Sequence, residues 1–314
     1  MSSLGPTFTL AMPDLHFAPL PHRGLIAVRG DDRGAFLQGL VSNDVRKVEA
    51  GLAAWAAFLT PQGKFLHEFF MFGLGNAIWL ECERERRADL IAQLSKFKLR
   101  AKVQFDAVDE LAVGAAWGRN VTAAFGLRDE SGMVTALGAG VVFVDPRLKG
   151  AGVRWSLLAA NAPDVLGELG LQAALPSDYD RWRVSLGLPD GSRDMEVEKA
   201  ILLENGFDEL GGLDWDKGCY LGQELTARTH YRGLIRKRLL PVGFDADPPE
   251  PGADVMQDGK PVGVVRSVGP GCALVLLRLD ALAPGAGDLL IGSTTVTPQV
   301  PGWVKLPEQT SASG

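Results

Sequence analysis

Residues 217–224 decide the fold, and they read Lys217-Gly218-Cys219-Tyr220-Leu221-Gly222-Gln223-Glu224. Gly218 and Gly222 flank a thiol and an aromatic ring, and glycine lets the backbone turn tightly or approach a ligand closely. Lys217 supplies a cation, Gln223 a two-sided amide and Glu224 a carboxylate acceptor. This mixture suits a ligand with an amide-like ring edge and a carboxylate tail. A structural loop with a packed thiol is the alternative, because isolated cysteines often act as small buried hydrophobes.

The octapeptide carries every fixed position of the K-G-C-[FY]-x-G-Q-E signature, and on it the chain resembles the YgfZ family. Further stretches continue the resemblance: 36–44 (FLQGLVSND), 59–64 (LTPQGK), 179–183 (YDRWR), 187–189 (GLP), 227–228 (AR) and 231–233 (YRG). The likeness runs from about residue 25 to residue 279. The octapeptide is a specific signal, and the supporting stretches are individually weak.

The resemblance implies an α+β fold like that of the glycine cleavage T-protein: tandem ferredoxin-like α+β units around a central channel, with a small C-terminal β-barrel. Residues 1–240 would form this GcvT-like folate-binding region, with units at roughly 20–110 and 111–240. Strand-like and helix-like runs that recur in a similar order agree with two units. Proline-rich residues 245–252 mark a boundary, which puts the barrel at 241–306 and a disordered tail at 307–314.

Several local expectations follow from the pattern alone. The first ~20 residues read as a loose arm or an edge strand. Residues 196–203 read as a short helix, and one strand is expected over 289–296. The basic run Arg228, Arg232, Arg236, Lys237 and Arg238 could guide an anionic ligand or partner, or could be a solvated strand edge.

By resemblance, the protein would bind tetrahydrofolate or a derivative and support iron–sulfur cluster assembly or repair, including that of tRNA-modifying iron–sulfur enzymes. Its partners would be a reduced folate and iron–sulfur proteins or assembly factors. The alternative is a folate-dependent aminomethyltransferase. His67-Glu68 departs from the acidic residues that family members carry there, and a misplacement of ~1 Å can cost ~100-fold in rate. We therefore expect an accessory protein and not an enzyme.

Cys219 is the expected functional thiol, because a thiol between a lysine and a glycine turn is a candidate for partial ionisation. It would contact a transient iron–sulfur cluster shared with a partner, or react with a one-carbon unit. The residues expected around the folate are Asn43, Asp44, Glu204, Lys217, Tyr220, Gln223, Glu224 and Arg228. Each has a structural alternative: a solvated lysine, a packed tyrosine, or side chains that cap local backbone.

Charge, cysteine and histidine counts and the length of apolar runs argue against several classes of protein. The net charge of −6 argues against a general nucleic-acid binder. Three well-separated cysteines and four histidines form neither a disulfide framework nor a spacing typical of metal ligands. The N-terminus lacks a secretory pattern, and no apolar run reaches the ~18 residues of a membrane span. The sequence therefore predicts a cytoplasmic protein without a metal site of its own.

Overall fold

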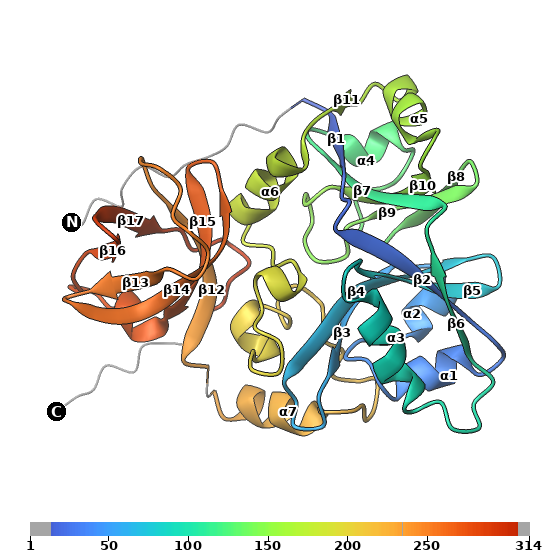
Figure 1. Ribbon diagram of the computed structural model, residues 1–314, viewed down its shortest axis with the longest axis horizontal. Coiled ribbons are helices and arrows are strands. Elements are labelled where there is room, and N and C mark those ends of the chain that lie inside the picture. Colours follow the sequence, from blue (N-terminus) through green and yellow to red (C-terminus); the bar gives the residue numbers. More distant parts are fainter. Residues whose placement is uncertain (1–13, 234, 307–314) are drawn as a thin grey trace.

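The computed structural model describes residues 14–233 and 235–306, so the predicted tail at 307–314 lies outside the described residues. Two β-sheets with helices on their outer sides form one part of the molecule, and a β-barrel forms the other (Figure 1). This is the α+β architecture with a C-terminal barrel expected from the sequence. Among the described residues, no helix combines the length and apolar character that a membrane crossing requires.

The first sheet is antiparallel and has the order β3-β4-β5-β2-β6. Its strands are β2 (Arg23–Arg29), β3 (Ala54–Leu59), β4 (Phe65–Leu74), β5 (Ala77–Glu83) and β6 (Gln104–Val108). Its helices are α1 (Arg33–Gln38), α2 (Arg46–Glu49) and α3 (Arg87–Ser95). Side chains alternate across a strand, so Ile26 and Val28 pack on the helix side while Leu25 and Ala27 face the molecular centre. Both faces of this sheet are therefore buried.

The second sheet has the order β11-β1-β7-β10-β9-β8. Its strands are β1 (His16–Pro19), β7 (Leu111–Trp117), β8 (Val134–Leu137), β9 (Gly140–Val144), β10 (Val153–Leu158) and β11 (Gln172–Ala173), with α4 (Val121–Ala124) and α5 (Ala162–Glu168) beside them. Strand β1 pairs in parallel with β11 and antiparallel with β7. The expectation of a loose arm or an edge strand is wrong for residues 16–19, because β7 pairs with all four and β11 pairs with His16 and Phe17 on the other side. Residues 1–13, the rest of that prediction, lie outside the described residues.

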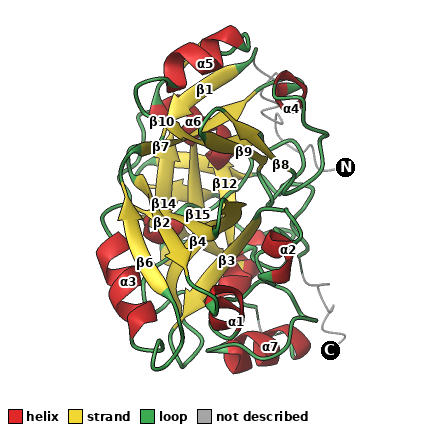
Figure 2. Cartoon of the chain, turned by 90° about the vertical axis from the view of Figure 1, so that its right-hand side faces the viewer, coloured by secondary structure: helices red, strands yellow, loops and turns green. Residues whose placement is uncertain are grey.

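The inner faces of the two sheets share one apolar core. Trp55 and Phe70 of the first sheet and Val113 and Phe143 of the second belong to it, and Phe207 stacks on Trp55 at 3.8 Å between ring centroids. Figure 2 shows the strands in the interior and most helices on the outside. The middle of the molecule is therefore filled by large side chains contributed by both sheets.

The barrel is closed in the order β12-β15-β14-β13-β16-β17. Its strands are β12 (Lys237–Gly243), β13 (Asp254–Gln257), β14 (Lys260–Gly269), β15 (Cys272–Arg278), β16 (Leu289–Ile291) and β17 (Thr294–Pro298), with a 3-10 turn at Leu279–Leu282. Strand β12 begins before the predicted boundary at 241. The single strand expected over 289–296 is two strands, because the chain reverses at Gly292, where φ is +60°.

Two further elements connect the sheets to the barrel. Helix α6 (Pro176–Ser185) contacts strands β14 and β15 of the barrel as well as β1. Helix α7 (Gln223–Tyr231) was not anticipated from the sequence, and it begins with the last two residues of the octapeptide. The helix expected over 196–203 is wrong: that segment is a turn followed by a 3-10 helix at Leu202–Asn205, and another 3-10 helix lies at Gly191–Arg193.

A candidate functional loop around Cys219

The octapeptide forms a loop that ends at the start of α7. Gly222 is the residue before the helix, with φ at +79°. A Cβ at this position would lie 2.5 Å from the Thr60 carbonyl oxygen and 3.1 Å from the Gly63 Cα. Only glycine allows this approach, so the loop rests directly on the turn at 60–63. Two stretches of the resemblance, far apart in sequence, are thereby in contact.

Lys217 fixes the loop to the end of α1. Its Nζ donates to the backbone carbonyls of Gln38, at 2.7 Å, and Val41. In return, the side-chain amide of Gln38 donates to the Lys217 backbone carbonyl at 3.3 Å. The Leu221 amide donates to the Gly39 carbonyl at 3.1 Å. Burial lowers the pKa of Lys217 to about 8, against the opposing effect of Asp44. The lysine therefore lies turned inward, with protein acceptors already bound.

Cys219 lies in this hydrogen-bonded loop, and its side chain is exposed to solvent. Cys82 is buried in β5, and burial raises the pKa of its thiol to about 12. Cys272 is half-buried in β15, and burial raises its pKa as well. A thiol reacts or binds metal as the thiolate, so burial disfavours both of the others. Cys219 is the most exposed cysteine of the described residues, and hydrogen bonds from Lys217 and Leu221 hold the loop on both sides of it.

Asn43 and Asp44 lie beside this loop, with their polar atoms bound to protein. The Asn43 amide donates to the carbonyls of Trp55 and Gly211, both at 2.7 Å. Its oxygen accepts from Lys47 Nζ at 2.8 Å. Hydrogen bonds from Arg46 lower the pKa of the Asp44 carboxyl to about 2. Both side chains thus organise the turn after α1.

The other expected site residues lie in the loop, on α7 and in the 3-10 helix at Leu202–Asn205, which contacts α7. Tyr220 is buried, and burial raises its pKa to about 12. The Gln223 side chain accepts from the Tyr220 amide at 3.3 Å, while Glu224 and Arg228 are exposed on α7. Glu204 is half-buried in the 3-10 helix, and burial raises the pKa of its carboxyl.

The sequence did not predict a cluster of aromatic side chains formed by Trp215 and two residues of α7. Trp215 lies 4.3 Å from His230 and 6.3 Å from Tyr231 between ring centroids. The indole of Trp215 donates to Asp208 at 2.7 Å, and Tyr231 is 79% exposed. The signal available in the sequence was the pair His230-Tyr231 within the basic run at 228–238, for which the sequence suggested an anion-guiding surface or a solvated strand edge and no helix.

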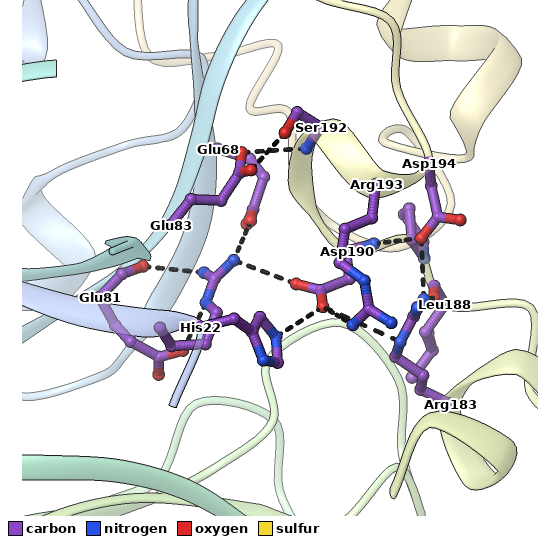
Figure 3. A network of polar contacts seen from close by, with 12 residues as sticks. His22, Glu68, Glu81, Glu83, Arg183, Leu188, Asp190, Ser192, Arg193 and Asp194 are labelled. Atoms are coloured by element: carbon purple, nitrogen blue, oxygen red, sulfur yellow. Dashed lines mark hydrogen bonds and ion pairs between the residues drawn. The ribbon is translucent and has the colours of Figure 1, made fainter. Parts of the chain in front are cut away.

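Glu68, the acid that resemblance placed at the catalytic position, belongs to a buried network of ion pairs. Arg23 of β2 donates to Glu68, to Glu81 at 3.1 Å and to Asp190 at 3.1 Å, and the Trp55 indole donates to Glu68 at 2.7 Å. Figure 3 shows these carboxylates around the guanidinium, with Arg183, Arg193 and Asp194 beyond them. Burial raises the pKa of Glu68, against the opposing effect of Arg23. Only 2% of Glu68 is exposed.

Four of these side chains already have protein partners. Asn43, Asp44 and Lys217 bind protein atoms, and Glu68 is enclosed by Arg23 and Trp55, so their polar atoms are not free to hold a folate. We derive no step through a folate from them. Over residues 14–233 and 235–306, no group of three or more His, Cys, Asp or Glu side chains could hold a metal ion.

Comparison with known proteins shows the family to which the chain belongs. Residues 236–306 match the model of the CAF17 C-terminal beta-barrel domain. The human iron–sulfur cluster assembly factor IBA57, mitochondrial, is 34% identical over 278 residues, which cover 82% of this chain and 76% of the human protein. The chain belongs to the IBA57 family. The mouse relative is 33% identical over 313 residues, covering 90% of this chain and 84% of that protein.

Fungal members of the IBA57 family are longer. The relative from Coccidioides immitis is 33% identical over 257 residues, covering 76% of this chain and 59% of that protein. The chain therefore spans less than two thirds of the length of such relatives. Among solved structures, glycine cleavage system aminomethyltransferase T from Bartonella henselae superposes with a TM-score of 0.74 at 17% identity, covering 92% of this chain and 86% of the other. That likeness shows the GcvT-like fold.

The comparisons correct the predicted location. The human, mouse and Coccidioides relatives are all named mitochondrial, so the prediction of a cytoplasmic protein is wrong by this comparison. The physical reason is that the features used do not separate the two compartments. A reduced cysteine set and the lack of an apolar span fit any reducing aqueous compartment.

Proposed function

We propose that this protein is an accessory factor of iron–sulfur cluster assembly and that Cys219 is the thiol it presents to a cluster or to the protein that carries one. The IBA57 relatives are named as assembly factors. The observation that carries the proposal is the exposed Cys219 at the tip of a loop held by Lys217, Gly222 and the turn at 60–63. Thiolates are the usual protein ligands of iron–sulfur clusters.

One exposed cysteine supplies one ligand, whereas clusters are commonly held by four. A cluster at Cys219 would therefore be completed by thiolates of a partner, which agrees with a transient, shared role. Rigid placement favours such a role, because a thiol on a fixed loop loses little conformational entropy when a partner docks. Which iron–sulfur proteins are the clients, tRNA-modifying enzymes among them, stays a prediction.

An accessory role is favoured over aminomethyl transfer by the position of Glu68. A general base must come within hydrogen-bond reach of the proton that it removes. Glu68 is enclosed by Arg23 and Trp55, and their hydrogen bonds occupy its carboxylate oxygens. Its arrangement is that of a structural ion pair.

Folate binding remains a prediction from the family resemblance. A titration of the purified protein with reduced folates, followed by tryptophan fluorescence, tests it. Saturable binding would require a site other than the side chains that are already bound to protein. The absence of binding at millimolar folate would remove the ligand while leaving the assembly role intact.

Rescue of human cells depleted of their own IBA57 tests the proposed function. The chain would be expressed with a mitochondrial targeting peptide added, and the activity of iron–sulfur enzymes would be measured at matched protein levels. We expect the wild type and Glu68→Gln to restore activity equally. Failure of the imported, folded wild type would contradict an assembly role, and failure of Glu68→Gln alone would indicate acid–base catalysis.

A further inference from the structure

The connection between α3 and β6 has features that folding does not explain. Residues 96–102 read Lys-Phe-Lys-Leu-Arg-Ala-Lys, and no acidic residue occurs between Asp89 and Asp106. Leu99 is 92% exposed at the tip, and Phe97 is 37% exposed. In Figure 1 this connection extends to the same end of the molecule as α7. The turn therefore combines four cations with an apolar tip in solvent.

The backbone at Leu99 is strained. The Ala101 amide donates to the Lys98 carbonyl at 2.7 Å, which closes a turn with Leu99 as its second residue, and φ at Leu99 is +42°. Turns with a positive φ at this position favour glycine, asparagine or aspartate, because a Cβ crowds the backbone there. The ends of the turn are fixed, since the Lys102 amide donates to Asp32 at 2.7 Å. Leu99 thus gains little from burial while adopting a costly conformation, and such strain is typical of functional positions.

The charges around Leu99 are available to a partner. Lys102 lies 3.9 Å from Asp31, and the salt bridges of the described residues include none to Lys98 or Arg100. Lys98 and Lys102 line a shallow hollow of about 510 Å³ together with Arg29 and one acid, Asp31. The three cations outnumber this carboxylate. Phe97 packs edge-on against Phe58 at 6.0 Å, and that contact fixes one side of the turn.

We propose that residues 96–102 form a docking surface for an acidic segment of a partner protein, with Leu99 as its apolar anchor. The whole chain carries a net charge of −6, so this local positive surface would orient an acidic partner. Arginine and aromatic side chains are enriched at protein interfaces, and the turn offers Arg100 and the partly exposed Phe97 beside Leu99. One leucine and a partly packed phenylalanine provide too little apolar area for stable insertion into a bilayer. This surface goes beyond the proposed function and requires no contribution from Cys219.

The test uses fluorescence anisotropy at low salt, with a fluorescein-labelled peptide that alternates glutamate and leucine. We expect saturable binding that weakens as salt rises. The double variant Lys98→Glu with Arg100→Glu should bind about tenfold more weakly, since each reversal replaces an attraction by a repulsion. The matched control is Arg119→Glu with Lys149→Glu, which changes the net charge equally at exposed positions of the second unit. It should bind within about twofold of the wild type.

Leu99→Asn separates docking from stability. Asparagine tolerates a positive φ, so this variant should melt at the wild-type temperature or above it, yet bind the peptide about fivefold more weakly. Equal binding by Leu99→Asn, no saturable binding by the wild type, or equal losses in the charge variant and its control would overturn the proposal. So would Leu99-dependent sedimentation with phosphatidylserine vesicles. Cys219→Ser should bind the peptide normally, so a failure here is distinct from a failure of the assembly role.

Discussion

At the residue scale, Cys219 differs from Cys82 and Cys272 in exposure, because its side chain lies on a loop while theirs lie in strands. When native protein reacts with a disulfide reagent, we predict that the exposed Cys219 reacts fast, the half-buried Cys272 reacts slowly and the buried Cys82 is protected. Mass spectrometry should locate the fast reaction at Cys219, and Cys82 should react only after unfolding because it is buried in β5. Fast modification of Cys82 in native protein would contradict the packing of the first sheet.

Asp44 should make the free energy of unfolding depend on pH in the acidic range. Hydrogen bonds from Arg46 lower its pKa to about 2, below the ordinary aspartate value of 3.8. A carboxyl with a depressed pKa stabilises the fold above its unfolded pKa, and this contribution is lost as pH falls from about 4 to 2. We expect Asp44→Asn to cost about 1 kcal/mol at pH 7, since the largely exposed Arg46 reduces the effect.

Urea unfolding of the wild type and Asp44→Asn at several pH values checks this prediction. The difference in unfolding free energy between the two proteins should shrink below pH 4. A difference that stays constant down to pH 3 would show that the Asp44 carboxylate is not the stabilising group.

At the element scale, the glycines of the loop allow a matched comparison. A Cβ on Gly222 would meet the Thr60 carbonyl at 2.5 Å, whereas nothing lies within 4 Å of a Cβ on Gly218. Both have positive φ, at +79° and +92°. Gly222→Ala should therefore destabilise the protein by about 2–3 kcal/mol and Gly218→Ala by only about 1 kcal/mol, as measured by urea unfolding. Equal losses would mean that the contact with the 60–63 turn is not tight.

Local pattern predicted the strands well and the loops between them poorly. Residues 111–117 and 153–158 are short apolar runs between turn residues, a pattern that predicts strands, and they form β7 and β10 with these bounds. The supposed helix at 196–203 failed because tertiary contacts hold that segment. The Phe65 amide donates to the Ala200 carbonyl, and the Glu198 amide donates to the Phe65 carbonyl. Such non-local backbone pairing leaves no periodic signal in the sequence.

The candidate loop was predicted from its residue types, but its construction was not. The octapeptide and the stretch at 36–44 were recognised separately, whereas the inward turn of Lys217 onto Gln38 and Val41 depends on their packing. A lysine is usually exposed, so sequence alone favoured a ligand-binding or solvated cation. The structure shows a side chain that binds backbone carbonyls.

At the scale of the whole molecule, charged side chains connect parts that are distant in sequence. Arg154 of the second sheet donates to Glu81 of the first, and Arg183 of α6 donates to Ser267 of the barrel at 2.8 Å. Strand β1 likewise precedes the first sheet in the chain but pairs within the second. These long-range arrangements determine how the three parts fit together, and a local sequence pattern does not contain them.

Arg23 lies at the centre of this network, and its removal should be severe. Arg23→Met would leave the Glu68 carboxylate buried without its cation, while Glu81 would keep Arg154, and an unpaired buried carboxylate typically costs about 3–5 kcal/mol. Glu68→Gln keeps an acceptor for Arg23 and Trp55, so it should cost no more than about 2 kcal/mol. Chemical denaturation of both variants measures the difference. Similar losses would contradict the assignment of Arg23 as the central cation.

The central claim is that Cys219 is the working thiol of an iron–sulfur assembly factor, and the most direct measurement compares Cys219→Ser with Cys272→Ser in the rescue of cells depleted of IBA57. Both variants should fold and accumulate like the wild type, because neither side chain lies in the buried core. We predict that Cys272→Ser restores iron–sulfur enzyme activity, while Cys219→Ser restores less than about a tenth of it, since serine is a poor ligand for a cluster. Full rescue by Cys219→Ser at wild-type protein levels would contradict the account.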